Sequence, residues 1–262
     1  MRILQRGMRG DDVAMWQAFL LRSGEDVGEP DGAFGPRTLA ATRAFQAAHG
    51  LSADGVVGPA TLARALALGF APLEWPADAD EKGPFWPPRP PGLRPLVTFA
   101  ERAALFGGFE YEAAPTPDDP ERIHVLGGWE EKNVVAVDLP QLAGIAGAPA
   151  DRRIRFHRKG EAQLRALWSA WERAGLLPLV LSWGGSYAPR FVRGSRGSVS
   201  NHAFASAFDV NVAWNGRGRA PARVGEKGSV RELVPLANAH GFYWGGHFSR
   251  PDGMHFEIAR LG

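Results

Sequence analysis

The sequence predicts an α+β protein with two domains, a small three-helix bundle and a larger domain of mixed strands and helices. Three observations lead to this prediction. A turn-and-helix pattern occurs twice within residues 1–70, and eight of the 21 prolines lie between Pro72 and Pro95. Beyond residue 95, β-branched runs and helical patterns follow one another in mixed order. We therefore expect domains at 1–70 and 95–262, joined by a proline-rich linker at 71–94.

The composition limits the kinds of site that the chain can build. Its 262 residues are 45% hydrophobic, which suits a globular protein with a sizeable core. The absence of Cys excludes disulfides and thiolate metal ligands, so any metal must be held by His, Asp or Glu. A net charge of +2 gives no argument for binding nucleic acid. We expect no membrane span and no signal peptide, because the sequence lacks the apolar runs that both require.

The repeat in the small domain marks where helices begin. Residues 31–40 are DGAFGPRTLA, and residues 54–63 are DGVVGPATLA. In each copy Asp-Gly favours a turn, and Pro suits the first position of a helix. Upstream of the first copy, Val13, Trp16 and Leu20 lie on one face at helical spacing. The expected helices are 11–23, 36–49 and 59–68.

In the larger domain, apolar spacing and capping residues indicate helices, and β-branched runs indicate strands. Leu164, Leu167 and Trp171 repeat on one helical face. Ser229 and Glu232 match a capping box at the start of another helix. The expected helices are 97–105, 160–173 and 229–239. The expected strands are 122–126, 133–139, 177–183, 242–244 and 254–258.

Two His and one Asp form the candidate metal site. His202 and Asp209 lie seven residues apart with small or apolar residues between them, and His255 lies on a predicted strand. Two imidazoles and a carboxylate suit a zinc ion whose fourth position stays open to water, as catalysis requires. Asp252, three residues before His255, could take the proton of that water. The alternative is a hydrogen-bonded structural His202, with Asp209 as a loop cap.

The doubled Asp-Gly-x-x-Gly-Pro-x-Thr pattern resembles the peptidoglycan-binding domain that is common in cell-wall hydrolases. Phe45-Gln46 and Gly50-Leu51, between the two copies, also fit that domain. The resemblance covers residues 3–68 and implies that a sugar-peptide ligand lies in a shallow groove near the helix ends. A three-helix bundle of unrelated purpose is the alternative, since a fold alone does not define a function.

The larger domain resembles the VanY-type zinc D-alanyl-D-alanine carboxypeptidases and the L-alanyl-D-glutamate endopeptidases of phage endolysins. The resemblance rests on Ser-x-His-x6-Asp at residues 200–209 and Asp-x-x-His-Phe-Glu at residues 252–257. Residues 185–190 and 241–246 also fit these families. The resemblance implies a DD-peptidase/hedgehog-like fold with a central antiparallel sheet, and Zn2+ as the cofactor.

Carried over residue by residue, this resemblance assigns a role to each site position. It makes His202, Asp209 and His255 the zinc ligands and Asp252 the catalytic base. Arg190, with Arg193 as second choice, would stabilise the oxyanion or the substrate carboxylate. The remaining candidates for substrate binding are Ser200, Trp244 and His247.

Two positions depart from the family pattern, and Glu257 is expected to support the site from outside the ligand set. Residues 205–207 are Ala-Ser-Ala where many relatives place a Gly, so only the requirement for small residues is kept. His247 follows Trp-Gly-Gly where relatives often have Asp, and as a fourth ligand it would close the metal site. Glu257 is expected to orient a ligand by a hydrogen bond and not to react itself.

The function implied by both resemblances is that of a peptidoglycan hydrolase with a wall-binding module. The cleaved bond would lie in the stem peptide or cross-bridge, by D-Ala-D-Ala carboxypeptidase or L-Ala-D-Glu or cross-link endopeptidase action. A non-catalytic wall-binding protein with a structural zinc domain is the alternative, and a small-dipeptide hydrolase is a third. We expect a monomer that acts at the cell wall or periplasm, as a phage endolysin or a secreted effector would.

Overall fold

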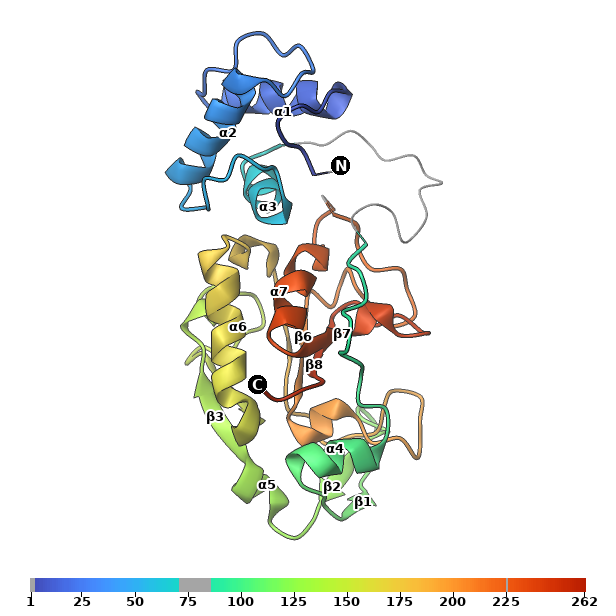
Figure 1. Cartoon of the computed structure of the whole chain (residues 1–262). Helices are drawn as coiled ribbons and strands as arrows, with labels where there is room; N and C mark the ends of the chain where they lie inside the picture. Colours follow the sequence, from blue (N-terminus) through green and yellow to red (C-terminus); the bar gives the residue numbers. More distant parts are fainter. Residues whose placement is uncertain (1–2, 71–85, 225) are drawn as a thin grey trace. The chain divides into compact units, whose positions relative to one another are not determined.

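The computed structural model describes residues 3–70, 86–224 and 226–262, and it confirms the α+β class (Figure 1). Most of the expected linker, residues 71–85, lies outside the described residues. The predicted boundaries at 1–70, 71–94 and 95–262 stay predictions. By their internal contacts, the residues form two compact units. The first unit comprises Met1–Pro88, Ala170–Leu179 and Ala222–Leu233, and the second comprises Arg89–Ser169, Val180–Pro221 and Val234–Gly262.

Three helices in the first unit occur where the repeat predicts them. They are α1 (Asp11–Arg22), α2 (Pro36–Ala48) and α3 (Pro59–Ala67), and α2 and α3 each begin with the Pro of one repeat copy. Their inner faces share one apolar core. Its buried members are Leu4, Val13, Trp16, Phe19, Leu20, Val27, Phe34, Ala41, Phe45, Val57, Leu62, Ala65 and Phe70.

A buried glutamine before each repeat copy fixes the turn that follows. Nε2 of Gln17 donates to Asp31 Oδ1 and to Thr38 Oγ1, both at 2.9 Å. Oε1 of Gln17 accepts from the backbone N–H of Gly32 at 2.9 Å. The side chain of a residue on one helix thus fixes the turn that starts the next helix, and both ends of its buried amide are hydrogen-bonded. The second copy repeats these contacts with Gln46, Asp54, Thr61 and Gly55.

The second unit contains a four-stranded antiparallel sheet and two separate two-stranded ribbons (Figure 1). In spatial order the sheet strands are β5 (Trp183–Gly185), β6 (Ala207–Val210), β8 (His255–Ile258) and β7 (Phe242–Trp244). The ribbons pair β1 (Tyr111–Ala113) with β2 (Ile123–Val125), and β3 (Val134–Asp138) with β4 (Arg153–His157). The other helices are α4 (Phe99–Phe106), α5 (Trp129–Asn133), α6 (Glu161–Arg173) and α7 (Val234–Ala239), and the end of α6 from Ala170 onward is counted in the first unit.

The two faces of the four-stranded sheet have different chemistry, because successive side chains of a strand point to opposite faces. Phe208 of β6 stacks on its register partner Phe256 of β8, with ring centroids 5.5 Å apart. Trp168 of α6 covers this aromatic face and lies 6.0 Å from the ring of Phe208. Asp209 and His255, one position along each strand, are also register partners and face the opposite side. The sheet thus carries an apolar core on one face and the candidate ligands on the other.

The expected strand at 177–183 is wrong over most of its length. Residues Leu177–Leu179 form a short 3-10 turn, and the strand begins only at Trp183. Pro178 cannot donate to a sheet. The N–H groups of Leu181 and Ser182 donate to the side chain of Asn211, at 2.7 and 3.0 Å, and not to a neighbouring strand. The side chain of Asn211 thus accepts the hydrogen bonds that the backbone of a neighbouring strand would accept in a sheet.

The helix expected at 229–239 begins later than the capping pattern indicates. Arg231–Leu233 form a 3-10 turn, and α7 follows at Val234. The hydroxyl of Ser229 donates to the carboxylate of Glu232 at 2.7 Å. Strands β1, β4 and β6 and helix α5 have no counterpart among the elements that the sequence predicts.

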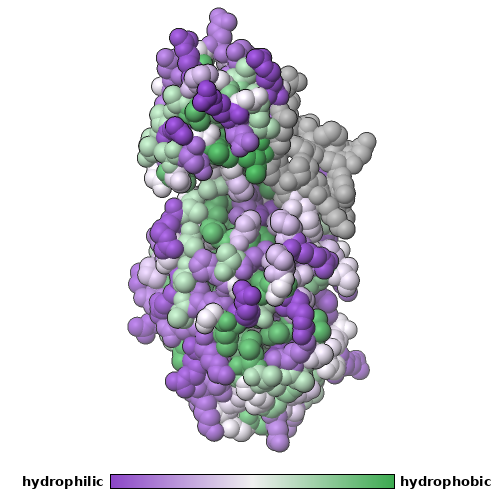
Figure 2. Space-filling view, viewed as in Figure 1, coloured by the Kyte–Doolittle hydropathy of each residue, from purple (hydrophilic) through white to green (hydrophobic). Residues whose placement is uncertain are grey.

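The surface of the described chain carries few large apolar side chains. Polar and apolar residues are interspersed over the face that Figure 2 shows. No helix in the described part is long and apolar enough to cross a membrane. Most described Trp and Phe side chains belong to the cores, and none is strongly exposed. The exposed large hydrophobic residues of the described ranges are Ile3, Leu21, Leu68, Val97 and Val212.

Candidate metal centre and active site

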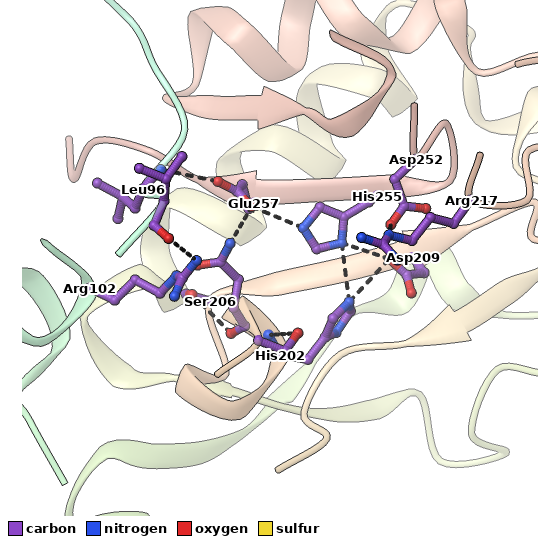
Figure 3. Close-up of polar contacts among 12 residues, drawn as sticks. Leu96, Arg102, His202, Ser206, Asp209, Arg217, Asp252, His255 and Glu257 are labelled. Carbon is purple, nitrogen blue, oxygen red and sulfur yellow. Dashed lines mark hydrogen bonds and ion pairs between the residues drawn. The ribbon is translucent and has the colours of Figure 1, made fainter. Parts of the chain in front are cut away.

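Three ligand atoms from His202, Asp209 and His255 converge on one point beside the sheet (Figure 3). Asp209 and His255 are paired across β6 and β8, and their Oδ1 and Nδ1 atoms lie 3.0 Å apart. Nε2 of His202 lies 3.2 Å from the same Oδ1 and 3.1 Å from Nδ1 of His255. Donors of a tetrahedral zinc ion are about 3.3 Å apart, given zinc–nitrogen bonds of about 2.0–2.1 Å. The three atoms therefore have the spacing of one face of a zinc tetrahedron.

The outer nitrogen of each imidazole has a hydrogen-bond acceptor of its own. Nδ1 of His202 donates to the carbonyl of Ser186 at 2.6 Å, and Nε2 of His255 donates to the carboxylate of Glu257 at 3.0 Å. These contacts leave the inner nitrogens as lone-pair donors that face each other. Such a pair repels unless a proton or a cation lies between the nitrogens. The buried donor set, with its oriented imidazoles, therefore fits a metal ion.

The charges of this cluster support the same conclusion. Burial by itself would raise the pKa of Asp209, but His202 and His255 beside it hold that pKa far below its usual value. Burial disfavours a charged His255, yet hydrogen bonds to Asp209 and Glu257 raise the pKa of its imidazole to about 10. A site that attracts a proton this strongly attracts a metal ion for the same reason, and the two compete.

The segment around His202 is built from a cap and small residues. Ser200 accepts the backbone N–H of His202 through its hydroxyl at 3.2 Å and so caps the 3-10 turn Asn201–Phe204. Ala205 has a left-handed backbone with φ of 52°, and its carbonyl accepts from the backbone of His157. Residues 203 and 205–207 are fully buried, which explains the need for small side chains. The hydroxyl of Ser200 thus supports His202, whereas the sequence predicted a contact with substrate.

Asp252 lies directly beside the ligand cluster. Its backbone carbonyl accepts the N–H of His255 at 3.1 Å, at the turn that leads into β8. Burial raises the pKa of the Asp252 carboxyl, and the charge of Asp209 adds to this effect. Among the described residues, no group donates a hydrogen bond to its Oδ1. The structure therefore brings the predicted base to the predicted metal site, with one oxygen left to accept a proton.

Of the two candidate arginines, Arg190 is the one that interacts with the carboxylates of the site. Burial and the charge of Arg193 lower the pKa of Arg190, and the nearby charges of Asp209 and Asp252 counteract that effect. Arg193 is exposed and binds two other acids, Asp119 at 2.5 Å and Glu121 at 2.6 Å. These interactions favour Arg190 over Arg193 as the arginine of the site.

The remaining two predicted substrate contacts are buried away from the ligands. Trp244 is the register partner of Phe256 and therefore points to the aromatic core face, where it is fully buried. This placement does not agree with a contact between Trp244 and substrate. His247 is also buried and packs against the ring of Tyr243, and the ligand cluster does not include it.

Two residues that sequence reasoning missed complete the surroundings of the site. Arg217, from the loop after β6, has Nε 3.9 Å from Oδ2 of Asp252. Asn201 donates to the same carboxylate oxygen of Glu257 that His255 contacts. Asn201 immediately precedes His202, and this adjacency could have drawn attention to it. No sequence signal singles out Arg217, because its place depends on how two loops pack.

The arrangement has the groups that metal-dependent hydrolysis needs. A buried set of two imidazoles and one carboxylate lies beside a second carboxylate and a partly buried arginine. The comparisons with known proteins agree with this class. Residues 9–64 match the family model of the putative peptidoglycan binding domain, and residues 193–258 match that of D-alanyl-D-alanine carboxypeptidase. Both resemblances identified in the sequence are thereby confirmed.

Three curated relatives match shorter stretches of the chain. An uncharacterized protein of Kitasatospora aureofaciens is 46% identical over 66 residues, which cover 24% of this chain and 53% of that protein. The zinc D-Ala-D-Ala carboxypeptidase of Streptomyces albus G is 64% identical over 31 residues, 12% of each chain. The N-acetylmuramoyl-L-alanine amidase CwlM of Mycobacterium tuberculosis is 49% identical over 53 residues, 20% of this chain and 13% of that protein. The chain thus spans about half or less of the length of these relatives.

One solved structure shares a similar stretch. The Burkholderia AP3 phage endolysin is 40% identical over segments that cover 25% of each chain, with a TM-score of 0.24. This score carries no conclusion about the fold of the whole chain.

Proposed function

We propose that the protein is a zinc-dependent peptidase that cleaves a peptide bond in the stem peptide or cross-bridge of peptidoglycan. The observation that carries this proposal is the convergence of His202, Asp209 and His255 beside Asp252, whose Oδ1 accepts no hydrogen bond from the described residues. The match of residues 193–258 to the carboxypeptidase family supports the reaction class. The proposal includes a DD-peptidase/hedgehog-like fold for the second unit.

His202, Asp209 and His255 would hold the zinc ion, each through the atom that faces the other two. Zinc bound in this way supplies a Lewis acid and a water molecule whose pKa is lowered to about 7. Ser186 and Glu257 keep both imidazoles in the tautomer that metal binding needs.

The other side chains handle the proton and the developing charge. Asp252 accepts the proton of the attacking water and later donates it to the leaving amine, for which it needs an oxygen without another partner. Arg190 donates to the carbonyl oxygen as negative charge develops on it. Burial around both groups strengthens these interactions, because water screens them less.

The first unit would hold the enzyme at its insoluble substrate. A binding module that stays attached to the wall raises the effective concentration of the peptidase near the stem peptides. The match of residues 9–64 to the peptidoglycan-binding family supports this role. We further propose a monomer that acts at the cell wall or in the periplasm.

Purified peptidoglycan tests the proposal through the amino acids or peptides that cleavage releases. We expect the zinc-loaded chain to release them, a chelator to stop the release, and added zinc to restore it. Asp252→Asn should keep its zinc but lose activity by a factor of about 10²–10⁴, the usual contribution of general base catalysis. Release that resists the chelator, or full activity of Asp252→Asn, would contradict the mechanism.

The alternative is a wall-binding protein with a structural zinc domain. A structural site would be closed by a fourth protein ligand. Among the described residues, the cluster offers three ligands only. A protein that binds peptidoglycan and zinc but leaves every peptide bond intact would establish this alternative.

A further inference from the structure

Arg217 is held next to Asp252 by close packing between two loops of the second unit. The backbone N–H of Gly218 donates to the carbonyl of Pro251 at 2.6 Å, one residue before Asp252. A Cβ at Gly253 would lie only 2.7 Å from Pro221, so the loops meet without room for a side chain there. The loop that carries Arg217 is therefore fixed against the segment that carries the base.

The guanidinium of Arg217 keeps most of its hydrogen-bonding capacity. Its Nη1 donates to the carbonyl of Arg193 at 2.7 Å, which anchors the side chain. The distance of 3.9 Å from its Nε to Oδ2 of Asp252 is an ion pair but too long for a hydrogen bond. The side chain is 28% exposed, so a ligand can reach it. The remaining N–H groups are available for a planar anion such as a carboxylate.

The carboxylates of the site already have guanidinium partners. Within the described chain, Glu257 interacts with Arg102, Asp209 with Arg190, and Asp252 with both Arg190 and Arg217. A divalent ion between the ligands would add positive charge, which an anionic group of the substrate would offset.

The position of Arg217 also indicates which part of the substrate it meets. Asp252 is the group that would donate a proton to the leaving amine, so Arg217, 3.9 Å from Asp252, lies near the place where that amine takes up its proton. In a peptide that ends one residue beyond that bond, the leaving amino acid carries its own carboxylate close to its amine. In a cross-linked or extended peptide, an uncharged amide stands in the same place.

We propose that Arg217 binds the free carboxylate of the leaving amino acid and so selects peptides that end one residue beyond the scissile bond. The inference rests on the proposed peptidase function and narrows its substrate class to chain termini. In this assignment Arg190 donates to the carbonyl oxygen of the scissile bond, and Arg217 binds the terminal carboxylate.

Binding of two small peptides to the metal-depleted full chain tests this role without turnover. The probes are N-acetyl-D-alanyl-D-alanine and its C-terminal amide, with affinities measured by calorimetry. We expect the wild type to bind the acid about tenfold more tightly than the amide, as a hydrogen-bonded charge pair allows. Arg217→Gln should abolish this preference and Arg217→Lys should retain part of it. An unchanged preference in Arg217→Gln, or none in the wild type, would overturn the proposal.

Arg219→Gln is the matched control, since Arg219 is an exposed residue of the same loop and loses the same charge. It should keep the wild-type preference; loss of the preference there too would show a general charge effect and overturn the assignment to Arg217.

Hydrolysis of the same peptides by the zinc-loaded chain tells whether Arg217 binds the substrate carboxylate or only positions Asp252. Arg217→Gln should raise KM for the acid much more than for the amide, whereas the loss of the ion pair with Asp252 should change kcat equally for both peptides. Equal changes of kcat/KM for the two peptides would mean that Arg217 acts only through Asp252, which overturns the proposal. Absence of hydrolysis by the wild type, with the carboxylate preference intact, would contradict the peptidase function but support carboxylate binding by Arg217.

Discussion

Glu257 links the metal site to the rest of the second unit through one buried carboxylate. Its two oxygens accept from Nε2 of His255 at 3.0 Å, from the amide of Asn201, and from the backbone of Leu96 at 3.2 Å (Figure 3). A carboxylate that orients a ligand imidazole also raises its basicity and hence its affinity for a metal. Glu257 would therefore strengthen the binding of a metal ion without being one of its ligands.

Glu257→Gln should weaken zinc binding by a factor of about 10–100 while the fold is kept, because glutamine has the same shape but no charge. Competition with a chromogenic chelator measures the zinc affinity. Glu161→Gln on α6 removes a partly exposed carboxylate and should change nothing. Equal zinc affinity of Glu257→Gln and wild type would show that the hydrogen bond does not tune the metal.

His157, at the end of β4, should make the free energy of unfolding depend on pH. It is fully buried, and its Nε2 donates to the carbonyl of Phe106 at 3.0 Å while its Nδ1 accepts from the backbone of Lys159. Burial lowers the pKa of its imidazole from 6.5 to about 4. The unfolded chain therefore takes up this proton at a higher pH than the folded chain does. The contribution to stability is complete above pH 6.5 and is lost as the pH falls toward 4.

This contribution amounts to about 3 kcal/mol over the full range, at about 1.4 kcal/mol for each unit of pKa. We expect His157→Gln to remove it, so that the unfolding free energy of the variant depends less on pH between 6.5 and 4. Denaturant unfolding of both chains across this range measures the difference. His124→Gln, at an exposed position on β2, is the control. Parallel pH profiles for His157→Gln and wild type would refute the assignment.

At the scale of elements, the sequence predicts best where a local signal coincides with packing. The Pro of each repeat starts a helix as expected, and the strands at 242–244 and 254–258 occur within one residue of their predicted limits. β1 and β4 are short edge strands whose pairing depends on distant partners, which no local pattern shows. Residues 177–183 have the composition of a strand, but the N–H groups of Leu181 and Ser182 donate to the side chain of Asn211 and not to another strand.

In the candidate site, too, the sequence predicts the residues that belong to a local motif but not those that distant segments bring together. His202, Asp209 and His255 could be selected from the sequence because their spacing resembles a known motif, and the structure brings them together. Trp244 lies next to a motif in the sequence, yet strand alternation turns it to the core. Arg217 comes to Asp252 only through loop packing between Gly218 and Pro251, so sequence spacing could not reveal it.

The glutamine contacts of the first unit predict an element-scale effect on stability. Gln46 of α2 satisfies the turn before α3 with four hydrogen bonds and is buried. Gln46→Ala leaves Gly55 N–H and Asp54 without this partner and should lower the stability of the first unit by about 1–3 kcal/mol. Calorimetry of the full chain should show one transition at a lower temperature. Gln5→Ala, at an exposed position, is the control, and an unchanged thermogram for Gln46→Ala would contradict the role.

At the scale of the whole molecule, the proposed function joins two sites that would act on one polymer. Residues 9–64 match the putative peptidoglycan binding domain, and residues 193–258 match the D-alanyl-D-alanine carboxypeptidase family. The first unit is built from hydrogen-bonded turns around a small core. The second unit has a polar sheet face on which three candidate ligands converge. Cleavage of wall peptides by a bound metal ion is the central claim for this combination.

Mass spectrometry of the products released from purified peptidoglycan tests that claim most directly. After incubation with the zinc-loaded chain, we predict muropeptides with new peptide termini in the stem or cross-bridge, and intact glycan bonds. The loss of a terminal alanine alone would fit the selection by Arg217. Peptides identical to those of an untreated sample, or cleavage confined to the glycan or to the bond between sugar and peptide, would contradict the account.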